Sequence, residues 1–134
     1  MQQLSSEEAW ALLESKPGWG SLTTLDEDGL PHTVAIGYFV LDRKIYSGCR
    51  AGTRKCRNLS RDPRAAMMIH AEGPEVGLRG AVFQGMARVI EEPSELLDLK
   101  SRLARKKGEP EPTSVSPGIA YLELTPQRIR SWKR

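Results

Sequence analysis

The sequence predicts a single, mainly β domain: an antiparallel barrel with helices packed on its outside. Short runs rich in β-branched and large apolar residues are separated by tight-turn residues, which is typical of antiparallel strands. Two amphipathic stretches with helical spacing interrupt these runs, and such helices normally cover a sheet. Because 134 residues suit one domain, we assign residues 1–134 to one unit.

The first half of the chain predicts a helix followed by a three-stranded antiparallel meander. Ser5 and Glu8 have the spacing of a capping box, and Lys16-Pro17-Gly18 should end the helix that they begin. Asp28-Gly29 supplies the positive φ that a tight hairpin needs. The strands are expected over residues 19–25 and 32–40 and from residue 45, with turns at 26–29 and 41–44.

The second half predicts two further helices among further strands. Thr53 is a candidate N-cap for a helix over 54–61, which Asp62-Pro63 should end. The strand over 65–70 is apolar throughout, so we expect both of its faces to be buried. The remaining expected elements are a loop over 48–53, one or two strands over 76–90 with bulges or close backbone approach at its glycines, a helix from 93, a charged loop over 105–113 and a final strand over 119–124.

A basic segment begins at the end of the loop over 48–53. It contains one acid, Asp62, and six basic residues: Arg50, Arg54, Lys55, Arg57, Arg61 and Arg64. Arg54 and Lys55 stand at a helix start, where free N–H groups and the helix dipole already attract anions, so cations there are unfavourable unless an anion binds. The segment therefore indicates either a phosphate site at these two residues or a solvated basic helix face.

Other kinds of site have little support in the sequence. There is no Ser-His-Asp arrangement and no glycine-rich nucleotide motif. Cys49 and Cys56 do not form a CxxC pair and lack nearby histidines, so no metal site is predicted and both thiols should be reduced. His32 and His70 fit hydrogen-bonded surface or edge positions better than acid–base roles.

The bulk composition is that of an ordinary soluble globular protein, which we expect to be cytoplasmic. It is 39% hydrophobic and 28% charged, with no apolar run of about 20 residues and no signal-peptide pattern, so no membrane partner is expected. The net charge of +3 admits nucleic acid as a partner. No phenylalanine, tyrosine or tryptophan lies within residues 50–64, however, so we do not expect nucleic-acid binding.

The order of the motifs resembles the pyridoxamine-5′-phosphate-oxidase-like, FMN-binding split-barrel family. The most specific match is Gly52-Thr53-Arg54-Lys55-Cys56-Arg57-Asn58-Leu59 followed by Arg61-Asp62-Pro63-Arg64. Weaker matches are Asp28-Gly29-Leu30-Pro31-His32, Gln84-Gly85-Met86-Ala87-Arg88-Val89 and residues 124–132, so the resemblance covers nearly the whole chain. It implies a six-stranded antiparallel split β-barrel that forms a homodimer with flavin sites at the interface.

The resemblance also implies a cofactor, FMN or alternatively a deazaflavin coenzyme, and residues that hold it. An arginine fork and a lysine point charge suit a phosphate. The implied cofactor residues are Thr53, Arg54 and Lys55 for the phosphate, Val34, Ala35, Ile36 and Gly37 along the flavin ring, and Ser47, Gly48 and Cys49 for further phosphate or ribityl contacts.

The departures from the family pattern bear on the substrate. The vitamin B6 oxidase carries two basic residues in the strand that here reads Thr33 to Tyr38, and it has a long C-terminal substrate-binding part where this chain has the short tail 128–134. Pyridoxamine phosphate is therefore not the expected substrate. The resemblance implies a flavin-dependent oxidoreductase acting on an unknown small molecule, with Arg79 or Arg88 available to stabilise the reduced flavin. The alternatives are a deazaflavin-dependent reductase, or a non-catalytic module that binds flavin or haem, with His32 or His70 as the haem ligand.

Overall fold

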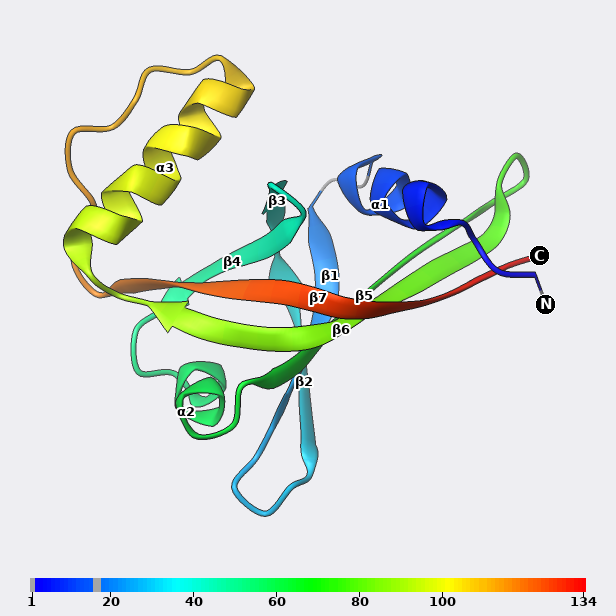
Figure 1. Cartoon of the computed structure of the whole chain (residues 1–134), viewed down its shortest axis with the longest axis horizontal. Helices are drawn as coiled ribbons and strands as arrows, with labels where there is room; N and C mark the ends of the chain where they lie inside the picture. Colours follow the sequence, from blue (N-terminus) through cyan, green and yellow to red (C-terminus); the bar gives the residue numbers. More distant parts are fainter. Residues whose placement is uncertain (1, 16–17) are drawn as a thin grey trace.

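A computed structural model describes residues 2–15 and 18–134 and shows a curled antiparallel sheet that forms a split barrel with helices around it (Figure 1). The prediction of a mainly β split barrel is confirmed, with seven strands in place of the expected six. The strands are β1 (Trp19–Leu25), β2 (Pro31–Gly37), β3 (Phe39–Leu41), β4 (Lys44–Arg50), β5 (Arg64–Gly73), β6 (Gly77–Ile90) and β7 (Ile119–Lys133). The helices in the described residues are α1 (Ser6–Ser15), α2 (Arg54–Arg61) and α3 (Pro93–Lys107). None of these helices is long and apolar enough to cross a membrane.

Helix α1 begins at the predicted capping box. The Ser5 N–H donates to Glu8 Oε1 at 2.9 Å, and the Glu8 N–H donates to Ser5 Oγ at 3.1 Å. Trp10 packs on Phe83 of β6 with ring centroids 4.9 Å apart, which holds the helix against the sheet. The helix ends at Ser15, and the predicted stop at Lys16 and Pro17 lies outside the described residues.

The strand order, β2-β1-β5-β6-β7-β4-β3, corrects the predicted meander. The expected strand over 32–40 is broken at Tyr38, which divides it into β2 and β3. The Tyr38 N–H donates to the Gly18 carbonyl at 2.7 Å, which is the last bond in register with the β1–β2 ladder, and its hydroxyl donates to the Leu13 carbonyl at 2.5 Å. From Phe39 on, the chain pairs with β4 instead. Strand β4 then pairs with β3 and β7, and the β1–β2 and β3–β4 hairpins lie at opposite ends of the sheet order.

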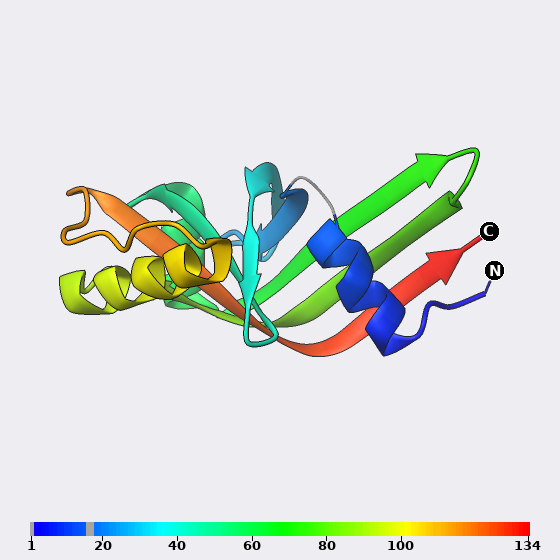
Figure 2. The same ribbon diagram turned by 90° about the horizontal axis from the view of Figure 1, so that it is seen from above.

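Strands β5, β6 and β7 extend into a long arm whose inner face is covered by α1 (Figure 2). Strand β6 is one strand of 14 residues, and β7 runs through the segment expected to be a tail. The pairing of β6 with β7 shifts register between Gln84 and Gly85, which confirms the expected bulge.

Strand β5 corrects the expectation of burial on both faces. Met67 and Ile69 are each 1% exposed and belong to the core, whereas Ala66 and Met68 on the opposite face are half-exposed. The register continues this opposite face across the sheet, because Met68 lies beside Ser21 of β1 and Val82 of β6. We call it the outer face; it comprises Ser21, Thr23, Ala35, Ala66, Met68, Val82 and Gln84.

Candidate functional site

The barrel is split between strands β2 and β4. Among the described strands, β2 pairs only with β1, and β4 beyond Tyr46 pairs only with β7. The two strands nevertheless approach each other, so two edges that lack a strand partner border the split. Backbone N–H and C=O groups on such edges are available to a ligand. The predicted residues Val34–Gly37 lie on the first edge, and Ser47, Gly48 and Cys49 lie on the second.

A hollow of about 440 Å³ opens beside the end of β4, between α3 and β7. Gly48, Cys49 and Arg50 line it from β4, and Lys100 and Tyr121 line it from the other side. A Cβ on residue 48 would lie 3.1 Å from the Tyr121 ring, so glycine allows the ring to pack closely on the strand. The Lys100 Nζ lies 5.8 Å from the centroid of the same ring, and the hollow therefore carries positive charge on two sides.

The loop after β4 leads into the basic start of α2, and no side chain among the described residues caps this helix. Thr53 occupies the N-cap position of α2 as predicted, but its Oγ1 donates to the Arg50 carbonyl at 3.0 Å and makes no capping bond. The first turn of α2 also contains no acidic residue. The amides of this turn are therefore left to attract an anion.

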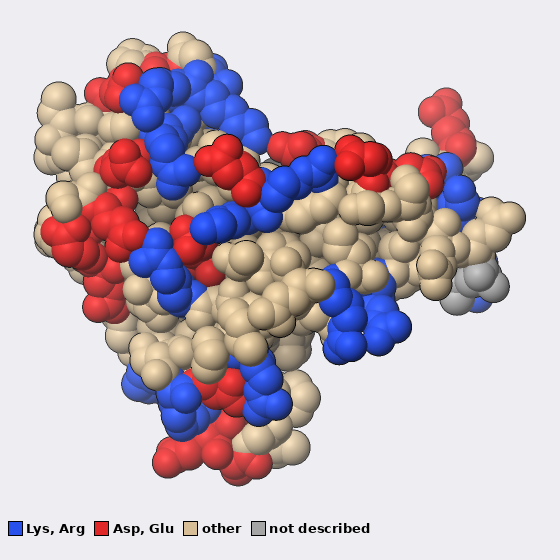
Figure 3. Space-filling model, in the orientation of Figure 1, with Lys and Arg blue, Asp and Glu red and all other residues tan. Residues whose placement is uncertain are grey.

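Most arginines of the basic segment donate hydrogen bonds to acceptors within the molecule. The Arg54 guanidinium grips the Asp26 carboxylate through two bonds, one of them from Nε to Oδ1 at 2.9 Å. In the same region, Figure 3 shows Lys and Arg interleaved with Asp and Glu around α2 and the β1–β2 hairpin. Three further arginines of the basic segment also have acceptors: the Gly52 carbonyl for Arg57, the Leu25 carbonyl for Arg61 and the Asp62 carboxylate for Arg64.

Asp26 is the centre of a polar contact that ties α2 to the β1–β2 hairpin. The buried Asn58 side chain donates to Thr24 Oγ1 and to Asp26 Oδ1, both at 3.0 Å. Hydrogen bonds from Arg54 and Asn58 lower the pKa of Asp26 to about 2, because both favour the charged carboxylate. The sequence predicts only a turn at Asp26, since nothing local indicates that its partner lies 28 positions further along the chain.

Because of this contact, part of the free energy of unfolding should depend on pH. The folded pKa of Asp26, about 2, lies below its ordinary value of 3.8, so the contribution is complete above pH 3.8 and is lost as the pH falls through about 2. We expect Asp26→Asn to lower the melting temperature near neutral pH and the difference from wild type to shrink on acidification. Thermal unfolding followed by circular dichroism measures this. Asp28→Asn is the control, because Asp28 binds only a backbone amide; a wild-type advantage that persists at pH 2 would contradict the assignment.

Two cations of the segment make neither an ion pair nor a side-chain hydrogen bond within the described part of the chain: Arg50 and Lys55. Lys55 is the second residue of α2, and Arg50 is the last residue of β4. Burial raises the pKa of the Cys49 thiol to about 11, and the Lys55 charge acts in the opposite direction. The structure therefore brings Arg50 to the hollow and Lys55 to the open helix start, while Arg54 is turned to Asp26.

The other predicted ring and ribityl residues occupy different environments. Ile36 and Ser47 are buried, so only their backbone is available at the split, whereas Ala35 is exposed. Val34 and Gly37 are half-buried on the same strand.

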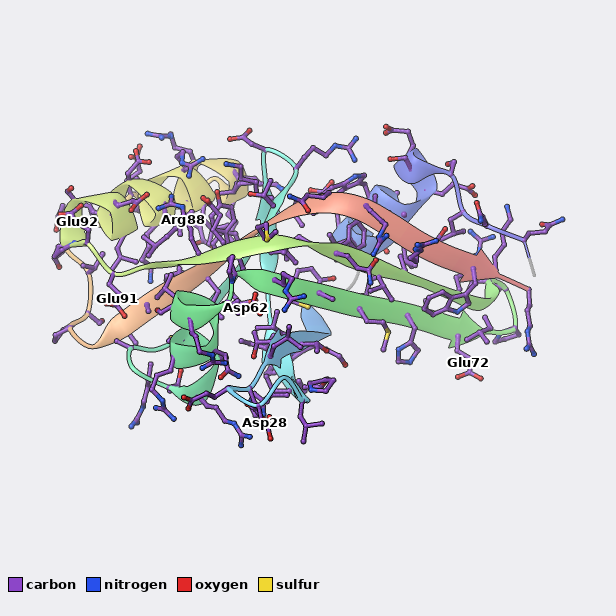
Figure 4. All side chains as sticks on the ribbon, turned by 60° about the horizontal axis from the view of Figure 1, so that its bottom comes forward. Asp28, Asp62, Glu72, Arg88, Glu91 and Glu92 are labelled. Carbon is purple, nitrogen blue, oxygen red and sulfur yellow. The ribbon has the colours of Figure 1, made fainter. Side chains whose placement is uncertain are left out.

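Neither arginine suggested for the reduced flavin is unpartnered. Figure 4 shows Arg88 of β6 directed toward α3, where its Nη2 donates to Glu95 at 2.5 Å and its Nε donates to Glu123 at 2.8 Å. Arg79 donates to the Val76 carbonyl at 3.2 Å.

The histidines suggested for haem do not face a common site. His32 is half-buried on β2, opposite Thr24 of β1, and His70 is exposed on the arm, opposite Gly80 of β6.

Comparisons with known proteins agree with this architecture. Residues 6–133 match the family described as pyridoxamine 5′-phosphate oxidase. A conserved hypothetical protein of Mycobacterium tuberculosis, Rv2991, is 28% identical, with a TM-score of 0.78 over 99% of this chain and 90% of that one. The FAD binding protein of Mycobacterium smegmatis is 18% identical, with a TM-score of 0.70 over 99% of both chains. An F420 reductase is 20% identical, with a TM-score of 0.68 over 93% of this chain and 98% of that one. No curated protein sequence matched.

Proposed function

The chain belongs to the pyridoxamine 5′-phosphate oxidase family, and from that premise we propose that it is an FMN-dependent oxidoreductase acting on a small molecule. One observation carries the proposal: two unpaired cations, Lys55 and Arg50, meet an uncapped helix start at the end of a split with free backbone edges. A phosphate-bearing, planar cofactor is the ligand that such a combination suits.

The donor set fits the two chemical halves of FMN. The amides of the first turn of α2 and the Lys55 ammonium offer charge and hydrogen bonds to a phosphate. The edges at Val34–Gly37 and at Ser47, Gly48 and Cys49 offer backbone groups to the ribityl chain and the ring.

This placement indicates what the cofactor and the protein would each contribute to the reaction. FMN supplies the hydride chemistry when bound, so the protein needs few acid–base groups. The chain's own residues then bind and orient: Lys55 and the α2 amides hold the phosphate, and the strand edges fix the ring. Arg54 acts indirectly, because its grip on Asp26 keeps α2 against the hairpin.

Binding tests this function directly. We expect the wild type to quench FMN fluorescence on binding, or to bind a deazaflavin coenzyme in a parallel titration. Lys55→Ala should weaken binding at least tenfold, about 1.4 kcal/mol, because it removes the unpaired charge at the helix start. Arg54→Ala is a poorer test because it also breaks the contact with Asp26.

The matched control is Lys107→Ala, which removes an exposed lysine from the last turn of α3 and should leave the affinity unchanged. If neither FMN nor the deazaflavin binds the wild type, the oxidoreductase proposal fails. A haem-binding or cofactor-free module then becomes the better interpretation.

A homodimer with the cofactor at its interface is the second part of the proposal. The outer face supports it, because small and apolar side chains cover several strands there without a helix over them. Trp19, 64% exposed, and Met86, 41% exposed, extend its apolar surface. A hollow of about 510 Å³ on the same face, lined by Ala66, Gln84 and Arg128 among others, leaves room for a ligand between two copies.

If the chain forms this dimer, one substitution on the outer face should halve the mass of the species in solution. Met68→Glu places a charge in the middle of the outer face and should convert a species of two chains into one of a single chain, because a buried unpaired charge is costly. Sedimentation velocity measures both masses. Ser114→Glu, in the exposed loop after α3, adds the same charge elsewhere and should leave the dimer intact. A monomeric wild type at micromolar concentration would end this part of the proposal.

A further inference from the structure

The two cysteines, 7 positions apart in sequence, meet where β4 ends and α2 begins. The Sγ atoms of Cys49 and Cys56 lie 3.4 Å apart, and both cysteines are free. Cys56 is buried in the first turn of α2, with the Thr53 hydroxyl 3.4 Å and the Arg50 carbonyl 3.6 Å from its sulfur. Cys49 is half-buried and lines the hollow beside β4, so one thiol of the pair is accessible from outside.

This arrangement is close to what a disulfide requires. An S–S bond is about 2.05 Å long, so the sulfurs need to approach by roughly 1.4 Å from their present contact. The residues between the cysteines include the turn at Gly52, whose φ of 77° is a glycine conformation. Ala51 is held by one backbone bond, from its N–H to the Gly118 carbonyl at 2.9 Å, and residues 51–53 belong to no strand. The remaining approach of the sulfurs therefore falls mainly to the two cysteine side chains.

We propose that Cys49 and Cys56 are a dithiol that closes reversibly into an intramolecular disulfide by exchange with a small-molecule disulfide such as oxidised glutathione. The Cys49 thiolate attacks one sulfur of the small disulfide, which forms a mixed disulfide and releases one thiolate. The Cys56 thiolate then attacks the Cys49 sulfur and releases the second. Overall, two protein thiols are oxidised, one disulfide is reduced to two thiols, and the two protons of the cysteines pass to the departing thiolates.

The bond would tie the start of α2 to β4. We call this redox-sensitive link between Cys49 and Cys56, at the helix start that carries Lys55, the clasp. Its formation does not depend on which cofactor, if any, binds there. The amides of residues 57–61, which are hydrogen-bonded within α2, should exchange hydrogen more slowly in the oxidised form, because local opening of the helix start is then restrained.

Mass spectrometry after equilibration with glutathione redox buffers tests the clasp. The exchange is run at mildly alkaline pH, since burial raises the pKa of Cys49. After acid quenching and alkylation, the wild type should lose both alkylation sites without gaining glutathione, and dithiothreitol should restore both. Cys56→Ser should retain one glutathione on Cys49, because no second thiol displaces it, and Cys49→Ser should remain unmodified.

Two results would overturn the inference: a wild type that stays fully alkylated in oxidised glutathione, or one that accumulates glutathione adducts or disulfide-linked dimers in place of the internal bond. If a serine variant fails to fold, hydrogen exchange on the wild type decides. Slower exchange at residues 57–61 in the oxidised sample supports the clasp, and unchanged exchange rejects it.

Discussion

Gly85→Ala is expected to destabilise the fold by about 3 kcal/mol, near the upper end for adding one methyl group to a packed site. A Cβ on residue 85 would overlap the carbonyl oxygen of Thr125 and crowd the backbone of Pro126. Strand β7 cannot recede there, because it pairs with β6 at Met86 on one side of the bulge and at Gln84 on the other. A loss of that size corresponds to a melting temperature lower by roughly 10 °C, measurable by thermal or urea unfolding.

The matched control is Gly73→Ala, at the far end of β5. Its Cβ would meet only the Val76 side chain at 4.0 Å, and the position has an ordinary backbone conformation. We expect a change within about 0.5 kcal/mol, since the variant adds a methyl group at an uncrowded surface position. Equal effects of the two substitutions would show that the approach of β7 to Gly85 is not what stabilises the bulge.

Glu123→Leu is expected to cost about 2–3 kcal/mol, because it leaves a buried hydroxyl without an acceptor. The Tyr46 hydroxyl donates to Glu123 Oε2 at 2.9 Å, and Tyr46 is 1% exposed. Burial alone would raise the pKa of Glu123, but hydrogen bonds from Arg88 and Tyr46 bring it below its ordinary value. Arg88 remains half in water and keeps Glu95 as a partner, so its charge is not stranded.

A double-mutant cycle with Tyr46→Phe isolates this contact. Tyr46→Phe should cost about 1 kcal/mol in the wild type but should recover part of the lost stability in the Glu123→Leu background, because it removes the buried hydroxyl that has lost its acceptor. Urea unfolding gives the four free energies. Additive effects would mean that the hydroxyl and the carboxylate act independently.

The sequence predicted local structure where a single residue type dictates it. The capping box, the Asp28-Gly29 turn and the end of α2 at Asp62 all depend on neighbouring residues, and all three are present. The pairing of β4 with β7 joins residues 69 to 79 positions apart, and no pattern within either strand specifies its partner. The break at Tyr38 likewise depends on Gly18 and Leu13, which a strand-like run of residues does not reveal.

The same limit applies to the candidate site. The density of positive charge at residues 50–64 was visible, and so was its position at a helix start. The sequence does not reveal which of these cations bind acceptors within the molecule, because the acceptors are Asp26 and carbonyl groups on other segments. Because Arg54 is bound to Asp26, we expect Lys55 and Arg50 to contribute more than Arg54 to a phosphate site.

The most direct test of the proposed site compares FMN with riboflavin, which lacks the phosphate, on wild type and Lys55→Ala. If Lys55 and the start of α2 hold the phosphate, the wild type should prefer FMN at least tenfold, and Lys55→Ala should remove most of that preference while binding riboflavin as the wild type does. An FMN preference that survives in Lys55→Ala, or equal binding of both ligands by the wild type, would contradict the account.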